Sequence, residues 1–181
     1  MPRILITGGA GFIGSNLVDF LLRNQSESDD LQITVLDALT YAGNPDNLPV
    51  SSQVTLIEGD VRNQGLVEKL ISDADFVYHL AAESHVDRSI ESSRIFIDTN
   101  VIGTLNVLEG IRKFGKKLIL VSTDEVYGSI DSGFADETSK LNPSSPYSAS
   151  KASADLLALS YFQTFGTDVV ITPISVVYDE D

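Results

Sequence analysis

Tyr147 and Lys151 are the two side chains whose types and spacing most directly suggest chemistry in this sequence. They begin a segment of helical periodicity, so residues four apart share one face of the expected helix. A nearby ammonium favours the ionised phenol, which would make Tyr147 a usable base near neutral pH. The Tyr-x-x-x-Lys pattern also arises by chance, and it gains weight only together with other motifs.

An acidic pair follows an apolar run over residues 117–122. Ser122 ends this run, and Thr123, Asp124 and Glu125 come directly after it. Two adjacent carboxyl groups can divide acid and base roles when their surroundings separate their pKa values. The alternative is that both are loop acids that face water.

Three glycines near the N-terminus predict a phosphate-binding turn. Gly8, Gly11 and Gly14 have the spacing that lets a backbone turn tightly and approach a pyrophosphate at a helix N-terminus. A tight turn without a ligand would also account for three glycines. The strand expected before them and the helix expected after them favour a dinucleotide.

Acidic residues also end or follow the next two apolar runs. Asp37 ends the run over residues 32–37, where a carboxylate can accept hydrogen bonds from the adenosine ribose and repel a 2′-phosphate. This position favours NAD over NADP, with a solvated carboxylate as the simpler alternative. Asp60 and Val61 follow the next run and could meet the adenine amino group, or they could form a plain turn.

Small residues follow the apolar run over residues 76–80, and two histidines flank them. Ala81 and Ala82 would let the backbone lie against a dinucleotide. Neither histidine has potential metal ligands nearby in the sequence, so no metal site is expected. We expect His79 to be a hydrogen-bonded strand residue rather than a catalyst, whereas both a functional and a structural role stay open for His85.

The elements that must position these side chains alternate along the chain. Short β-branched runs and longer segments of helical periodicity predict a parallel sheet with helices on both faces. With right-handed crossovers the expected fold class is α/β, a doubly wound parallel sheet of the Rossmann type. In such sheets ligands bind beyond the carboxyl ends of the strands, where most of the candidates lie. We expect strands at residues 3–7, 32–37, 54–58, 76–80, 117–122 and 168–172, and helices at residues 12–23, 63–72, 94–114 and 146–165.

Length and composition set further limits. The 181 residues suffice for one well-buried domain, expected over residues 1–181, and the 43% hydrophobic content is that of an ordinary globular protein. A formal net charge of −14 argues against a nucleic-acid partner, because such binding needs a basic face. The absence of cysteine fits a cytoplasmic protein, no apolar run is long enough to cross a membrane, and we expect no signal peptide.

Taken together, the glycine turn, the Ser122-Thr123 strand end and the Tyr147 and Lys151 pair resemble the extended short-chain dehydrogenase/reductase family. Members of this family modify nucleotide sugars with bound NAD. Three segments narrow the resemblance to the 4,6-dehydratases that act on dTDP-glucose: LTYAGN at 39–44, AAESHVDRSI at 81–90 and TDEVYG at 123–128. The resemblance runs from residue 4 to about residue 172. A sugar 4-epimerase would have no need of the acid pair.

The resemblance implies a role for each catalytic candidate. Tyr147 would take the proton from the sugar 4-hydroxyl, while Lys151 would hold the nicotinamide ribose and lower the tyrosine pKa. Thr123 would orient the 4-hydroxyl. Glu125 would remove the C5 proton and Asp124 would protonate the leaving C6 hydroxyl, so that water is lost.

Binding contacts and a partner are implied in the same way. The residues implied to contact NAD are Gly8, Gly11, Phe12, Ile13, Gly14, Asp37, Thr40, Asp60, Val61, Leu80, Ala81, Ala82, Ser84, Thr99, Ser122, Tyr147 and Lys151. Ser84, His85 and Thr123 would contact the nucleotide-sugar substrate. A homodimer through the helices at 94–114 and 146–165 is also implied. Leu156, Leu157, Leu159 and Tyr161 give the second helix suitable apolar positions, although a face that only covers the sheet is the alternative.

Two departures from the family pattern open other interpretations. Val176 and Val177 stand where the family has polar residues that meet the sugar nucleotide, and the family continues beyond residue 181 into a substrate-binding domain, which we expect to be absent here. We therefore expect the chain alone to bind NAD but to turn over dTDP-glucose poorly or not at all. A non-catalytic NAD-binding or assembly module is one alternative, and a compact short-chain reductase, which would not need the acid pair, is another.

Overall fold

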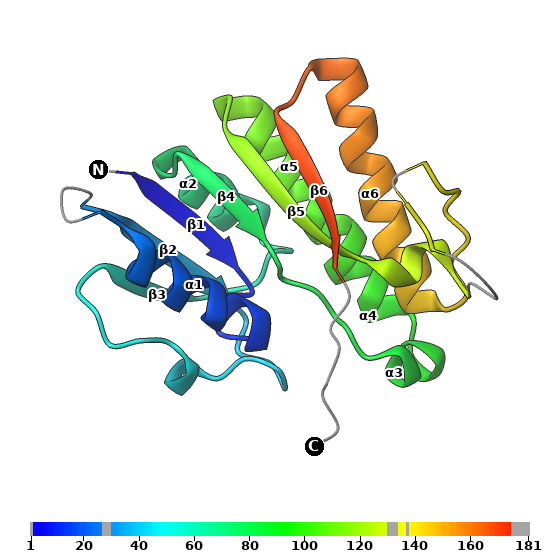
Figure 1. Ribbon diagram of the computed structural model, residues 1–181, viewed down its shortest axis with the longest axis horizontal. Coiled ribbons are helices and arrows are strands. Elements are labelled where there is room, and N and C mark those ends of the chain that lie inside the picture. The colour runs from blue at the N-terminus through cyan, green and yellow to red at the C-terminus, as the bar shows by residue number, and fades with distance from the viewer. Residues whose placement is uncertain (1, 27–29, 130–133, 137, 175–181) are drawn as a thin grey trace.

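The strands of this chain form one parallel sheet, shown in Figure 1. The computed structural model describes residues 2–26, 30–129, 134–136 and 138–174. The strands are β1 (Arg3–Thr7), β2 (Gln32–Asp37), β3 (Val54–Glu58), β4 (Phe76–His79), β5 (Lys117–Thr123) and β6 (Val169–Ile174). Their order is β3-β2-β1-β4-β5-β6, with every neighbouring pair parallel. This is the doubly wound Rossmann order, so the predicted fold class is confirmed.

Helices cover both faces of the sheet, because successive residues of each strand point to opposite sides. Helix α1 (Phe12–Asn24) packs on one face, where Ile4, Ile6 and Val18 share a buried cluster. Helices α2 (Gln64–Asp73), α5 (Gly103–Phe114) and α6 (Pro146–Phe165) contribute to the larger cluster on the opposite face, which contains Leu5 (Figure 1).

The expected helix over residues 94–114 is divided into three parts. They are α4 (Arg94–Phe96), the π-helical segment η2 (Ile97–Ile102) and α5. Within η2, the buried Asn100 side chain bonds to both backbone groups of Glu83. The prediction used the spacing of apolar residues, and that spacing does not report the contact of a polar side chain with a distant loop. The sequence pattern therefore did not reveal the π turn.

Three short elements were also missed. The bounds of β1, β2 and β3 agree with the prediction, and those of β4, β5 and β6 differ from it by one or two residues. The short elements are α3 (Val86–Glu91), η1 (Pro45–Asn47) and the 3-10 turn η3 (Asp124–Tyr127). Each is too short to show a period. The bounds of α6 agree with the prediction, since Ser145 and Ser148 form a capping box at its start and Gly166 ends it with φ 67°.

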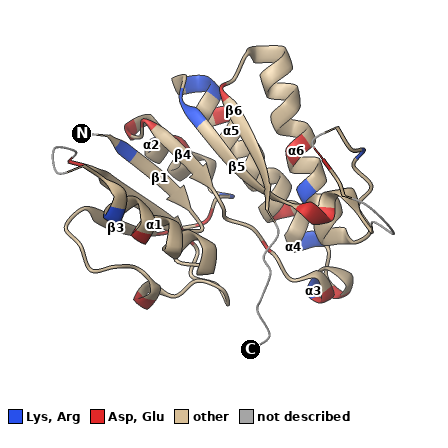
Figure 2. Cartoon of the chain, viewed as in Figure 1, with Lys and Arg blue, Asp and Glu red and all other residues tan. Residues whose placement is uncertain are grey.

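Helix α6 differs from the other long helices in its charge. Among its 20 residues the charged ones are Lys151 and Asp155, which stand one turn apart (Figure 2). Both are buried, with 6% and 5% of their surface exposed. None of the helices in the described ranges, α6 included, has the length and apolar character needed to cross a membrane.

Candidate active site

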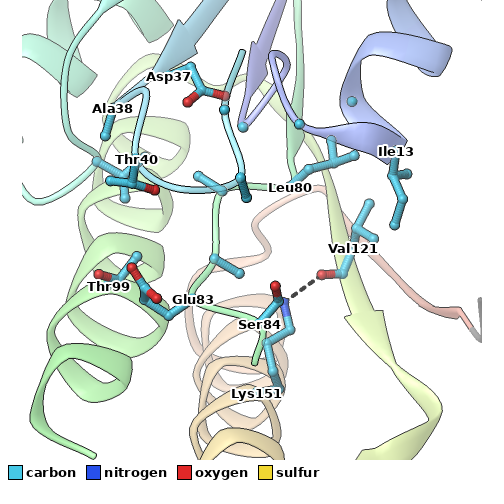
Figure 3. Close-up of a pocket in the computed structure, with 18 of the residues that line it drawn as sticks. Ile13, Asp37, Ala38, Thr40, Leu80, Glu83, Ser84, Thr99, Val121 and Lys151 are labelled. Carbon is cyan, nitrogen blue, oxygen red and sulfur yellow. Dashed lines mark hydrogen bonds between the residues drawn. The ribbon is translucent and has the colours of Figure 1, made fainter. Parts of the chain in front are cut away.

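A cavity of about 960 Å³ lies along the carboxyl ends of the strands. Its wall includes Gly8 after β1, Asp37 at the end of β2, Leu80 after β4 and Thr123 at the end of β5. Every residue that the sequence predicted to be catalytic, cofactor-binding or substrate-binding lies in this wall, and Figure 3 shows several of them. The two valines at 176 and 177 lie outside the described residues.

The glycine turn is built from closely packed backbone. A Cβ atom on Gly14 would lie 2.3 Å from the Gly8 carbonyl oxygen, and one on Gly8 would lie 2.6 Å from the Ala81 nitrogen. Gly11 is different, because its nearest neighbour would be 3.5 Å away. No side chain caps the start of α1, so its first N–H groups stay available to an anion.

Asp37 joins the glycine turn to the loop after β2. Its carboxylate is buried and accepts hydrogen bonds from the backbone N–H groups of Ala10 and Leu39, each at 2.9 Å. The alternative of a solvated carboxylate is therefore wrong. Each oxygen of a carboxylate has two lone pairs, so Asp37 can still accept a hydrogen bond from a ligand.

The turn after β3 holds an ion pair. Asp60 accepts three side-chain hydrogen bonds from Arg62, the shortest at 2.6 Å, and also the Arg62 backbone N–H. The side-chain hydrogen bonds from Arg62 lower the pKa of Asp60. Asp60 is thus bonded to Arg62 within the turn after β3. A contact between Asp60 and adenine stays a prediction. Arg62 and Lys151 are the basic residues of the cavity wall among the described residues. The sequence analysis did not identify Arg62.

His79 is enclosed by threonines. Thr104 donates its hydroxyl proton to the Asn100 carbonyl and therefore accepts from His79 Nε2 at 3.1 Å. With the proton of the neutral ring on Nε2, Nδ1 accepts from the Thr7 hydroxyl at 2.6 Å, and Thr7 also accepts the Ala81 N–H. Burial lowers the pKa of His79 to about 3, with a further contribution from the charge of Lys151. The expectation of a hydrogen-bonded strand residue is confirmed.

An aromatic and cationic group stands at the rim of the cavity. The rings of Tyr41 and His85 are 5.1 Å apart, and the guanidinium of Arg88 lies 4.1 Å above the Tyr41 ring. Tyr41 also accepts the Ser84 N–H. These contacts join the loop after β2 to the segment after β4, and no spacing in the sequence indicated that the two would meet.

The Asn100 side chain anchors the loop after β4 through hydrogen bonds. It accepts the Glu83 N–H and donates to the Glu83 carbonyl and to the Ser150 hydroxyl. The Glu83 side chain is buried in the cavity wall and extends toward Thr99 in Figure 3. Both Asn100 and Glu83 were missed as site residues. Across the described ranges, no group of three or more His, Asp or Glu side chains could hold a metal ion.

The acid pair lies on η3, directly after β5. Asp124 and Glu125 are exposed toward the cavity, and the Thr123 hydroxyl accepts the Glu125 N–H and donates to the Asp124 carboxylate, each at 3.3 Å. Desolvation raises the pKa of Glu125, and the charge of Asp124 raises it further. A carboxylate with a raised pKa is a stronger base than one in open water.

Tyr147 and Lys151 lie on the same face of α6, both buried, but their electrostatics differ from expectation. Lys151 donates to the Val121 carbonyl at 2.7 Å, the bond drawn in Figure 3. Burial lowers the pKa of Lys151 to about 8, and the charge of Asp155 opposes that decrease.

The expected lowering of the Tyr147 pKa by Lys151 is wrong in this structure. Desolvation raises the pKa of Tyr147, a hydrogen bond with Thr123 lowers it, and the charges of Glu125 and Asp124 raise it again. The phenol is buried near two carboxylates, while the ammonium is directed to a strand carbonyl. Tyr147 therefore keeps its proton at neutral pH in this structure.

Comparisons with known proteins agree with this geometry. A family model described as GDP-mannose 4,6 dehydratase matches residues 5–178. The dTDP-glucose 4,6-dehydratase of Streptomyces antibioticus is 51% identical over 176 residues, which make up 96% of this chain and 52% of the relative. That of Mycobacterium tuberculosis is 45% identical over 177 residues, 96% of this chain and 53% of the relative. The chain thus spans about half the length of the curated relatives it matches.

Solved structures show the same similarity. The dTDP-glucose 4,6-dehydratase of Streptomyces venezuelae with NAD and TYD bound has a TM-score of 0.90 at 49% identity, covering 94% of this chain and 55% of that one. The Bacillus anthracis enzyme in complex with NAD has a TM-score of 0.87 at 42% identity, covering 99% and 56%.

Proposed function

This chain belongs to the family described as GDP-mannose 4,6 dehydratase, and from that membership we propose that it binds NAD and carries the catalytic groups of a dTDP-glucose 4,6-dehydratase. The observation that carries the proposal is the acid pair, Asp124 and Glu125, in the same cavity wall as Tyr147. Removal of water needs one group to take a proton from carbon and one to protonate the leaving hydroxyl. The relatives at 51% and 45% identity bear the name of this dehydratase.

The cavity wall suits NAD. The packed backbone of the glycine turn leads into the uncapped start of α1, which suits a pyrophosphate even on a chain with a net charge of −14. Asp37 would accept a ribose hydroxyl and repel the 2′-phosphate of NADP. Lys151 would bind the nicotinamide ribose. Solved relatives from Streptomyces venezuelae and Bacillus anthracis contain NAD.

The first part of the reaction concerns the sugar 4-hydroxyl. NAD, when bound, supplies the group that accepts hydride from C4 and returns it to C6. Tyr147 receives the 4-hydroxyl proton, and Thr123, already in contact with the phenol, orients that hydroxyl. Because burial raises the pKa of Tyr147, the tyrosine needs positive charge nearby before it can act as a base.

The second part is the loss of water between C5 and C6. A ketone at C4 makes the C5 proton acidic, and Glu125 takes that proton. The carboxyl of Asp124 gives a proton to the C6 oxygen, so that the C5–H and C6–O bonds break and one water leaves. When hydride returns to C6, Glu125 gives the proton back to C5. The raised pKa of Glu125 supports its role as the base.

Conversion of dTDP-glucose tests this function. The purified protein is incubated with NAD and dTDP-glucose, and mass spectrometry follows the loss of one water from the sugar nucleotide, which detects even slow turnover. Tyr147→Phe should lower the rate by about 10²- to 10⁴-fold while NAD binding persists. Equal product from both proteins would contradict the assignment of Tyr147. Bound NAD without any product from the wild type would support the expectation that this chain alone turns over dTDP-glucose poorly or not at all.

We also propose that two copies pair through the outer face of α6 and the neighbouring helix formed by η2 and α5. Large apolar side chains are exposed there: Ile97, Ile102, Leu156, Leu159, Phe162 and Phe165. Tyr161 instead packs inward and hydrogen-bonds to Glu109. A helix that is apolar on both sides is normally buried on both sides. The exposed apolar face of α6 therefore supports a dimer. Light scattering at tens of micromolar that gives the mass of one chain would contradict it.

A further inference from the structure

The two buried charges of α6 stand next to each other along one face of the helix. Tyr147, Lys151 and Asp155 follow at intervals of four residues, and all three are buried. No other residue of α6 is charged (Figure 2). The proposed mechanism uses Tyr147 and Lys151, but it leaves Asp155 without a role.

Asp155 has one partner for two oxygens. Its Oδ2 accepts a hydrogen bond from the Ser122 hydroxyl at 2.6 Å, which links α6 to the end of β5. Its Oδ1 is buried and has no hydrogen-bond partner among the described residues. Leaving a buried polar atom unpaired is costly, and the cost is higher for a charged group, so this carboxylate requires an explanation.

A positive charge one helical turn away supplies one. Residues four apart on a helix are neighbours, with Cβ atoms about 5–6 Å apart. Lys151 directs its ammonium to the Val121 carbonyl, and it forms none of the ion pairs within 4 Å in the described part of the chain. Its attraction to Asp155 therefore acts at longer range, through a buried region where charges are weakly screened.

We propose that Asp155 is a positioning residue that keeps the buried Lys151 protonated and anchors it beside the end of β5. The carboxylate acts through Lys151 and through Ser122, and it does not itself face the ligands. The consequence for NAD binding rests on the proposed function, because it is Lys151 that would hold the cofactor. The charge relation between the two residues does not depend on it.

Electrostatics and neighbouring groups agree with this assignment. Burial lowers the pKa of Lys151 to about 8, and Asp155 is the group that opposes this decrease. Burial raises the pKa of Asp155, whereas Ser122 and Lys151 lower it. The titratable groups near this pair include His79 on β4, whose pKa the charge of Lys151 lowers, and Tyr147, Asp124 and Glu125, which share the cavity wall with Lys151. His79 is neutral near pH 7, and both acids act on Tyr147.

A direct NMR titration of the Lys151 side chain tests the proposal without cofactor or substrate. The sequence contains few lysines, and Lys151→Arg identifies the Lys151 signal. In the wild type the midpoint should fall near 8. Asp155→Asn keeps the shape of the side chain and removes its charge. In this variant the titration midpoint of Lys151 should be lower by about one pH unit or more. Asp155→Glu should restore most of the shift, because it restores the charge.

Controls separate this role from a purely structural one. Asp19→Asn removes the same charge from an exposed ion pair on α1, so it should leave the Lys151 midpoint unchanged. NAD affinity of Asp155→Asn should equal that of the wild type at pH 6 and fall behind as the pH approaches 8, whereas a structural defect would weaken binding equally at every pH.

The outcomes divide clearly. A Lys151 midpoint that does not move in a folded Asp155→Asn protein would overturn the proposal, whatever the protein binds. A shifted midpoint with no NAD binding in the wild type would support the charge relation and refute the proposed function instead. If Asp155→Asn does not fold, the wild type decides: the Lys151 signal should change as the Asp155 carboxyl titrates, and an unresponsive signal would overturn the proposal.

Discussion

Replacing Gly14 by alanine would place a methyl group inside the turn that precedes α1. The added Cβ would lie 2.3 Å from the Gly8 carbonyl oxygen and 2.6 Å from the Gly9 Cα, and both contacts are backbone atoms that cannot rotate away. Relief therefore requires the whole turn to shift. Overpacking of this kind costs about 1–3 kcal/mol of folding stability.

The same shift would move the N–H groups at the start of α1 away from the proposed pyrophosphate position. A hydrogen bond to a charged group contributes about 1.5–3 kcal/mol, so the loss of one weakens NAD binding roughly 10- to 150-fold. Isothermal titration calorimetry with NAD gives the affinity, and urea unfolding gives the stability.

Two other glycines serve as matched controls for Gly14→Ala. In Gly65→Ala the nearest atom to the new Cβ is 3.8 Å away, and alanine is about 1 kcal/mol better than glycine in a helix, so stability should hold or rise with NAD affinity unchanged. Gly11→Ala meets only an ordinary contact at 3.5 Å. It should keep its stability and lose affinity only if a ligand lies against it. Wild-type stability and affinity in Gly14→Ala would refute the packing argument.

Further substitutions address cofactor choice, acid stability and assembly. Asp37→Ala should weaken NAD binding, because two backbone hydrogen bonds of the loop are lost, and should narrow the preference for NAD over NADP; an unchanged calorimetric ratio would mean that another residue meets the ribose. The pKa of His79 is about 3 in the folded state and about 6.5 in the unfolded state. The free energy of unfolding should therefore decrease as the pH falls from 6.5 toward 3, by up to about 1.4 kcal/mol per pH unit, because only the unfolded state binds the proton in this range. His79→Gln should flatten this dependence in urea unfolding, and parallel curves would contradict it. Phe162→Glu places a charge on the exposed face of α6 and should give a monomer in light scattering, whereas a dimer of unchanged mass would exclude that face.

Local patterns in the sequence determined the fold and the members of the site. The β-branched runs and the periodic segments each depend on nearby residues, and a parallel order of strands brings their carboxyl ends to one edge. For that reason Gly8, Asp37, Thr123 and Tyr147, which are far apart in the chain, could be assigned to one cavity before the structure was known. The capping residues of α6 are likewise local, and its bounds were predicted correctly.

Tertiary structure decided what each site residue touches and how it is charged. Within η2, Asn100 meets Glu83 of a loop far away in the sequence, and at the rim Tyr41 meets Arg88. The sequence placed Lys151 one turn from Tyr147 and suggested a lowered phenol pKa. In the structure the ammonium is directed to Val121 and the phenol is buried, so its pKa is raised. A pKa depends on burial and on every neighbouring charge, and both are properties of the packed chain rather than of residue spacing.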